Sequence, residues 1–262
     1  MKRKVQKPGR FFILASVLGA LGLVALARLP FHRPPKAAAG RQQPSANHPT
    51  TVGLTGDLVI AKLLDRNRQR EARLQQYSVP STYRVKNEKG AVRAEVRAVL
   101  RYQAPDIKEF KIVAESGSGL IRSRVFKPLM EIEVETAAGR HRYDSSVTAN
   151  NYTFNLLGEE DVDGVHCFVV QTTAKRADKY LFNGKVWIHA TEFALVQVAG
   201  QPTQKPSVWI KRVEFVRRYQ KLKEFWLPLK NESITQVRVF GKNILTIDYD
   251  QYEITQASGA AP

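Results

Sequence analysis

The sequence contains very little cysteine, with one residue, Cys167, in 262. A single thiol excludes an intramolecular disulfide framework and any zinc or iron–sulfur site built from several cysteines. The five histidines are scattered and do not form the HExxH pair of a metalloprotease. The glycines around Ser118 make neither a nucleophile elbow nor a phosphate-binding loop. We therefore expect no enzyme, no metal site and no cofactor.

Acidic residues are absent from the first 50 positions, which nevertheless contain nine lysines and arginines. The whole chain has a formal net charge of +17, which by itself suggests a nucleic-acid-binding protein. The other 212 residues hold 32 basic and 24 acidic residues, so their net charge is only +8. Their basic side chains are spread out and match no nucleic-acid-binding motif. We predict no nucleic-acid partner, and a surface of this charge also suits a membrane with anionic lipid headgroups.

An unbroken apolar run, Phe11–Ala27, follows the basic residues at positions 1–10. A basic flank, an apolar stretch and a small-residue ending are typical of an export signal. As a helix the run rises about 25 Å, slightly less than the roughly 30 Å of a bilayer core. Residues 1–27 are therefore either a cleaved signal peptide or a retained N-terminal membrane anchor. Residues 28–53, rich in proline, alanine and polar residues, are predicted to be a disordered linker.

Residues 54–256 are predicted to form one domain, followed by a flexible tail at 257–262. Its first element is a predicted helix over Asp57–Tyr77, because apolar residues recur there at helical spacing. Thr55 or Asp57 is expected to cap the start of this helix.

After Pro80 the period of the apolar residues changes to two. The segment Val92–Gln103 alternates apolar and polar residues, as a strand with one buried face does in an antiparallel sheet. The segment Ser118–Ala137 returns to helical spacing. Pro128 is expected to kink that helix or to begin a second short one.

From Tyr152 onward, short strand-like runs alternate with turn signals. Two dipeptides, Asp163-Gly164 and Asn183-Gly184, predict two-residue hairpin turns. Further strands are predicted at Val165–Thr173, Phe193–Ala199, Val208–Leu222, Leu227–Phe240 and Ile244–Ile254. The total is ten or eleven strands, all joined by short reversals, without the strand–helix–strand alternation of a parallel sheet. The predicted fold is mainly β (α+β), with a large curved antiparallel sheet forming an open half-barrel and helices packed on its concave face. Its interior is either a ligand pocket or a solid core.

Several segments resemble bacterial outer-membrane lipoprotein-sorting proteins of the LolA/LolB-like superfamily. The resemblance covers roughly residues 54–256 and is strongest from Asn151 onward. The segments that carry it are NYTF (151–154), LGEEDVDG (157–164), YLFNGKVWI (180–188), SVWIKRVEF (207–215), FWLP (225–228) and VFGK (239–242).

This resemblance implies an open antiparallel barrel with helices in its mouth, located in the periplasm of a two-membrane bacterium. It also implies a hydrophobic cavity that holds the acyl chains of a lipid or lipoprotein. The candidate lining residues are large apolar side chains: Leu129, Met130, Trp187, Trp209, Phe215 and Trp226.

The leading hypothesis is an exported, non-enzymatic protein that binds lipid or lipoprotein acyl chains, with a role in outer-membrane lipoprotein sorting. Such a protein is expected to be periplasmic, either free or anchored to the inner membrane by residues 11–27. The alternative is a membrane-anchored envelope sensor or scaffold that uses the same fold to bind a partner protein. A third hypothesis, binding of a polyanion, predicts an affinity that falls steeply with salt.

Overall fold

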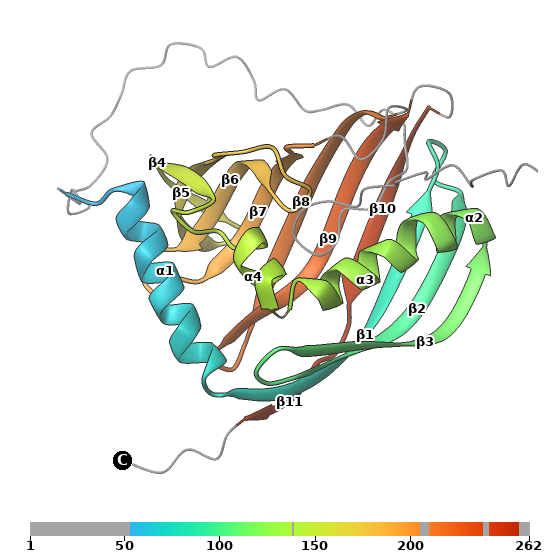
Figure 1. Cartoon of the computed structure of the whole chain (residues 1–262), viewed down its shortest axis with the longest axis horizontal. Coiled ribbons are helices and arrows are strands. Elements are labelled where there is room, and N and C mark those ends of the chain that lie inside the picture. The colour runs from blue at the N-terminus through green and yellow to red at the C-terminus, as the bar shows by residue number, and fades with distance from the viewer. Residues whose placement is uncertain (1–52, 138, 205–209, 238–240, 257–262) are drawn as a thin grey trace, which may run out of the picture.

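The computed structural model describes residues 53–137, 139–204, 210–237 and 241–256. Its eleven strands form one sheet in the order β3-β2-β1-β10-β9-β8-β7-β6-β5-β4, with β11 paired to β1, and every pairing is antiparallel. The sheet curves, and the helices lie across its concave side (Figure 1). This confirms the predicted open half-barrel and its number of strands. The predicted leader (1–27), the linker up to residue 52, and the tail (257–262) lie outside the described residues.

The strands are β1 (Leu74–Lys86), β2 (Val92–Gln103), β3 (Ile107–Gly117), β4 (Tyr152–Val162), β5 (Val165–Ala174), β6 (Phe182–His189), β7 (Leu195–Pro202), β8 (Ile210–Leu222), β9 (Phe225–Val237), β10 (Gly241–Tyr249) and β11 (Glu253–Gln256). The helices are α1 (Gly56–Glu71), α2 (Gly119–Ile121), α3 (Lys127–Glu135) and α4 (Gly139–Ser145), and a π-helical turn, Arg122–Phe126, joins α2 to α3. None of the described helices is long and apolar enough to cross a bilayer.

One connection is not a short reversal, contrary to expectation. Strands β3 and β4 follow one another in the chain but form the two opposite edges of the sheet. The chain between them, residues 118–151, therefore runs across the concave face from one edge to the other, and it carries α2, α3 and α4 (Figure 1).

Helix α1 begins as predicted but ends earlier. The Thr55 hydroxyl oxygen accepts a hydrogen bond from the backbone N–H of Leu58 at 3.2 Å, which caps the helix. The helix ends at Glu71 rather than at Tyr77, because β1 starts at Leu74 and pairs with β2 and β11 over the expected helical turn. Tertiary strand pairing thus outweighs the local helical spacing.

Only one of the two predicted dipeptide turns is confirmed. Asp163 (φ 50°) and Gly164 (φ 81°) turn β4 into β5 with two positive φ angles, as predicted. Asn183-Gly184 instead lies inside β6, so that prediction was wrong. Gly184 pairs directly with Gly200 of β7, and a β-carbon at position 184 would overlap the backbone carbonyl of Ala199. The glycine is needed for close approach between strands, not for a turn.

One other predicted strand is divided, and one predicted helical segment is confirmed. The predicted strand Ile244–Ile254 is two strands, β10 and β11, separated at residues 250–252. Helical structure over Ser118–Ala137 is confirmed, with Pro128 in the first turn of α3, where its missing N–H costs no helical hydrogen bond.

Two apolar clusters fill the space between helices and sheet. The first lies between α3 and strands β1, β2 and β10, and includes Leu129, Phe126 and Tyr83. The second lies between α1 and strands β5–β8, and includes Ile60 and Phe182. Between them runs a buried polar band on the concave side of β8–β10, made of Arg217, Asn231, Ser233, Thr235 and Asn243.

Substitution of Leu129 by alanine is expected to lower the free energy of unfolding by about 3 kcal/mol, because this side chain is 2% exposed and its removal leaves a cavity under α3. Leu120→Ala is the matched control, since Leu120 is 68% exposed, and its effect should stay within about 0.5 kcal/mol. Urea denaturation followed by circular dichroism measures both. Equal effects would mean that α3 is not packed on the sheet.

Candidate functional site

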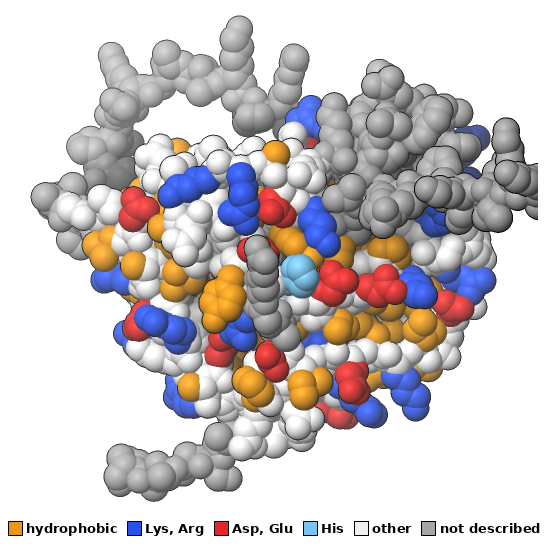
Figure 2. All heavy atoms as spheres, in the orientation of Figure 1, with side chains coloured by type: hydrophobic (Ala, Val, Ile, Leu, Met, Phe, Trp, Pro, Cys, Tyr) orange, Lys and Arg blue, Asp and Glu red, His pale blue; other side chains and the backbone are white. Residues whose placement is uncertain are grey.

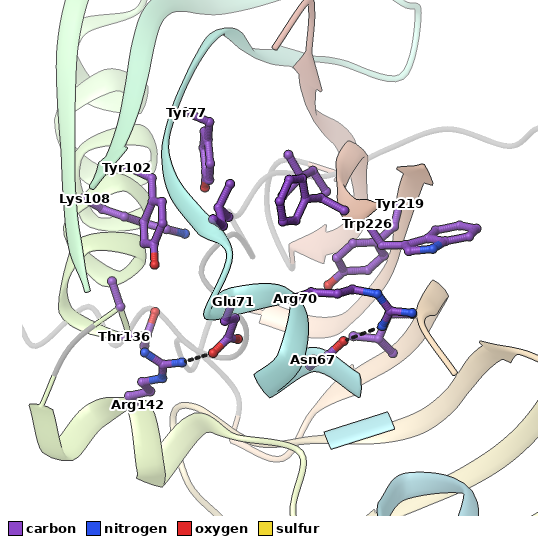
Figure 3. A pocket seen from close by; sticks show the side chains of 15 residues that line it. Asn67, Arg70, Glu71, Tyr77, Tyr102, Lys108, Thr136, Arg142, Tyr219 and Trp226 are labelled. Carbon is purple, nitrogen blue, oxygen red and sulfur yellow. Dashed lines mark hydrogen bonds and ion pairs between the residues drawn. The ribbon is translucent and has the colours of Figure 1, made fainter. Parts of the chain in front are cut away.

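A cavity of about 300 Å³ lies where α1 ends and β1 begins. Its wall combines aromatic and aliphatic side chains with a few polar groups (Figure 3). The lining residues are Asn67, Arg70, Glu71, Leu74, Tyr77, Tyr102, Lys108, Thr136, Ala137, Arg142, Leu195, Tyr219, Phe225, Trp226 and Leu227. They come from α1, the end of α3, α4 and both halves of the sheet, so the cavity exists only where these elements meet.

Stacked tyrosines form one wall of the cavity. The rings of Tyr77 and Tyr102 lie 5.1 Å apart with an angle of 22° between them, and Tyr252 packs edge-on against Tyr77. Tyr102 donates a hydrogen bond to the carbonyl oxygen of Pro105 at 3.0 Å, which fixes the direction of its ring. Burial raises the pKa of Tyr77, so the phenol stays neutral and the wall is uncharged at physiological pH.

Behind this wall, α3 places one carboxylate in the interior. The side chain of Glu133 is 3% exposed, and one of its oxygens accepts a hydrogen bond from Lys108 Nζ at 2.9 Å. The other oxygen lies 3.5 Å from the Tyr249 hydroxyl, which donates to it, and 3.9 Å from a guanidinium nitrogen of Arg217. Burial by itself lowers the pKa of Lys108, but the charge of Glu133 outweighs it, and the pKa is raised above its usual value. The Lys108 ammonium therefore stays charged.

The opposite wall is held by Arg70 and Glu192. Arg70 donates to the carbonyl oxygens of Glu192 and Phe193, at 2.6 and 3.2 Å, and so ties the end of α1 to the β6–β7 turn. The Glu192 carboxylate accepts hydrogen bonds from Trp226 Nε1 at 3.0 Å and from Lys221 Nζ at 2.6 Å. These contacts hold the Trp226 indole beside Tyr219 and Arg70 at the cavity (Figure 3).

An ion pair closes the outer edge of the cavity. Arg142 of α4 lies 2.5 Å from the Glu71 carboxylate of α1, and both side chains are about half exposed. Figure 3 shows this pair at the mouth, between α1 and α4. Exposed pairs contribute little stability, so this contact is easily exchanged.

The structure does not bring the five described candidates for the lining together in this cavity. Trp226 lines the cavity. Leu129 and Met130 lie in the first apolar cluster, and Phe215 lies in the second, against Phe182. Trp187 points to the other face of the sheet, with Cys167 and Val169, and donates to the Glu160 carboxylate. Trp209 lies outside the described residues. Ligand binding by these residues remains a prediction.

Sequence reasoning missed Arg70, Tyr77, Tyr102 and Lys108 as cavity residues. The sequence did indicate Arg70, because this charged residue falls on the side of the α1 helical wheel that is otherwise mostly apolar. Lys108 left none, because its partner Glu133 is 25 positions away and belongs to another element.

A second hollow, of about 660 Å³, lies over β6–β9 and touches both Trp187 and Phe215. About half of its other lining residues are polar, among them Gln171, Lys185 and Glu232. Cys167 is fully buried, and burial raises the pKa of its thiol to about 11. No cluster of three or more metal-ligating side chains occurs among the residues that the structure describes.

No family model matches the sequence, and no curated protein is similar enough to count as a relative. Solved structures with a similar fold include a DUF1329 family protein from Desulfovibrio piger, with 15% identity and a TM-score of 0.40 over 76% of this chain and 93% of that one. A putative outer membrane lipoprotein-sorting protein domain from Vibrio parahaemolyticus has 12% identity and a TM-score of 0.38, over 75% and 93%. A LolA superfamily protein from Nitrosomonas europaea has 11% identity and a TM-score of 0.37, over 77% and 94%. These likenesses concern the fold alone.

Replacing Glu133 by glutamine should lower the free energy of unfolding by about 3 kcal/mol, because it leaves the partly buried Lys108 ammonium without its buried carboxylate. The double variant Lys108→Met/Glu133→Leu should recover part of that loss, since it removes both charges together. Urea denaturation of Lys108→Met, of Glu133→Leu and of the double variant gives the coupling energy of the pair.

The matched control is Asp65→Asn, which breaks the exposed pair of Asp65 with Arg68 at 3.1 Å and should cost less than about 0.5 kcal/mol. A cost for Glu133→Gln as small as that of the control would show that the interior pair is not desolvated.

Proposed function

We propose that this protein is an exported, non-enzymatic binding protein that holds an acyl chain of a lipid or lipoprotein in the cavity between α1, α3 and the sheet. The observation that carries the proposal is the wall of the cavity, where tyrosine, tryptophan, phenylalanine and leucine side chains from both halves of the sheet converge. Small-molecule sites typically have such a concave, mostly apolar lining with a few fixed polar groups.

The size of the cavity suits one chain rather than several. At about 300 Å³ it stands at the lower end of the roughly 300–1,000 Å³ range of ligand pockets. Burial of each methylene is worth about 0.8 kcal/mol, so a segment of about ten methylenes gains roughly 8 kcal/mol before the cost of ordering the chain. Affinity of this kind needs no specific polar contact.

The helices serve as a lid in this proposal. Near the mouth, α4 is joined to α1 by the exposed Arg142–Glu71 pair, whereas α3 is held more firmly by Glu133 and by Leu129. Movement of α4 away from α1 is therefore the less costly way to admit a chain. In the same proposal, the protein acts in the periplasm, either free or anchored by residues 11–27. Its role there is in outer-membrane lipoprotein sorting.

A second candidate, binding of an envelope partner protein as a sensor or scaffold, is favoured by one observation. Strand β3 is an edge of the sheet, and it exposes Ile112 and Val113 by 52% and 63%. Exposed apolar edge strands can pair with an added strand from another chain. A cavity that takes up no acyl chain would favour this candidate.

An ω-brominated undecanol is expected to quench part of the tryptophan fluorescence, because bromine quenches an indole on contact and Trp226 lines the cavity. The quenching should disappear in Trp226→Phe and persist in Trp187→Phe, because Trp187 is not among the residues that line the cavity. Fluorescence titration measures both. Quenching that persists in Trp226→Phe and vanishes in Trp187→Phe would place the ligand elsewhere.

Filling the cavity should weaken binding of the bromoundecanol without disturbing the fold. Ala137→Phe adds a ring at the end of α3, where Ala137 lines the cavity, and it should weaken binding of the bromoundecanol at least about tenfold. The control Ala91→Phe, in the exposed β1–β2 turn, should leave the affinity unchanged. Lipid mass spectrometry of the gently purified protein should likewise detect a bound acyl lipid in the wild type and less in Ala137→Phe. Unchanged affinity in a folded Ala137→Phe protein would contradict the proposal.

A further inference from the structure

Six basic side chains line either the cavity or a hollow next to it, and we call them the cationic rim: Arg66, Arg70, Arg73, Arg142, Lys221 and Lys223. Five of them line a shallow hollow of about 410 Å³ beside the cavity, and Arg70 lines both spaces. Arg142 joins the rim through its ion pair with Glu71, the residue after Arg70. In the view of Figure 2, basic side chains are visible over α1 and below it.

The carboxylates around the mouth do not neutralise this rim. Arg142 pairs with Glu71, Arg73 with Glu224 and Lys221 with Glu192. For the other three cations the structure gives no carboxylate within 4 Å among the described residues: Arg66 donates to the Gln69 side chain, Arg70 to two backbone carbonyls, and Lys223 stands in the β8–β9 turn with a φ of 57°. The rim therefore carries a net positive charge next to an apolar opening.

Exposed apolar side chains accompany the rim. Tyr143, which follows Arg142 in the chain, is 77% exposed. Its backbone carbonyl oxygen accepts a hydrogen bond from the Asn151 side chain. Ile107, at the start of β3, is 47% exposed and lies two residues after Pro105, whose carbonyl oxygen accepts a hydrogen bond from Arg142 at 3.5 Å. Tyrosines are enriched where protein meets the headgroup region of a bilayer.

We propose that the cationic rim docks on a membrane surface that contains anionic phospholipids, with the mouth of the cavity facing the bilayer. Each lysine or arginine near such a surface contributes attraction, and Tyr143 and Ile107 enter the headgroup layer. The combination favours a membrane over a soluble polyanion, because a nucleic acid or polyphosphate offers no apolar phase for these two side chains. Docking needs only the rim, whereas transfer of an acyl chain from the membrane into the cavity rests on the proposed function.

The test uses the full chain with a fluorophore on Gln69→Cys, a position within the rim hollow. Native Cys167 is fully buried and should stay unlabelled while the protein is folded. The label reports contact of the rim with lipid, whether or not residues 11–27 attach the chain to the vesicle. The reference label is on Ala91→Cys, in the turn at the other end of β1.

Vesicles of phosphatidylcholine with phosphatidylglycerol should shift the emission of the label at position 69, and vesicles of phosphatidylcholine alone should not. The rim variant Arg66→Gln/Arg73→Gln/Lys223→Gln should need about 100-fold more anionic lipid for the same shift, which is about 3 kcal/mol for three charges. The control Arg93→Gln/Arg97→Gln/Lys111→Gln removes the same charge from exposed positions of β2 and β3 and should behave like the wild type. Arg70 is left intact because it holds the β6–β7 turn.

Three results would overturn the proposal: an equal shift with both kinds of vesicle, an equal loss in the control variant, or an equal shift of the label at position 91. A response to RNA as large as that to anionic vesicles would replace the membrane by a soluble polyanion. Bromoundecanol quenching in the same rim variant separates the two proposals, because that alcohol is uncharged and should bind with unchanged affinity. Failure of the quenching in the wild type, with a normal response of the label, would remove the proposed function and leave the docking.

Discussion

The pairing of β1 with β10 determines where every other part of the domain lies. It runs from Ser81 opposite Tyr249 to Lys86 opposite Ile244, and it joins the first hairpin of the domain to the last strands of the chain. Because β1 also pairs with β2, the segment β3-β2-β1 is added to one end of the meander formed by β4–β10, and β3 and β4 become opposite edges. The residues between β3 and β4 then have to cross the concave face, where their helices cover the sheet. The cavity is a consequence of this crossing, since α3 and α4 meet the end of α1 there.

The interior that this crossing encloses is partly polar. Glu133 enters from α3 between the two apolar clusters, and the polar band of β8–β10 lies on the facing side of the sheet. Three buried polar atoms, Tyr83 OH, Asn231 Nδ2 and Thr235 Oγ1, have no hydrogen-bond partner among the described residues. Such atoms are commonly satisfied by ordered water or by a ligand's polar groups. The polar band thus separates the two apolar clusters of the interior.

Local sequence patterns predicted a strand correctly where the pattern arises from the geometry of that strand alone. Val92–Gln103 coincides with β2 because alternate residues face the core and the solvent. The Asp163-Gly164 turn is correct because positive φ angles are a local requirement. The errors at Asp57–Tyr77 and Asn183-Gly184 have a different cause. Leu74–Tyr77 belongs to β1 because it pairs with residues up to 182 positions away, and Gly184 is needed because the backbone of β7 approaches closely. Of the five candidate lining residues that the structure describes, only Trp226 lies at the cavity beside α1, because Leu129, Met130 and Phe215 pack in the two interior clusters and Trp187 packs in a third.

By itself, the sequence determined the fold class, the antiparallel pairing of neighbouring strands, the cap of the first helix and the excess of positive charge, because each depends on residues close together in the chain. Only the tertiary structure decided which strands form the edges, where the cavity opens and which charges meet at it. Arg142 and Glu71 are 71 positions apart, and Lys108 and Glu133 belong to different elements. Their proximity follows from the pairing of distant strands, which is set by the summed burial of the whole sheet rather than by any local pattern.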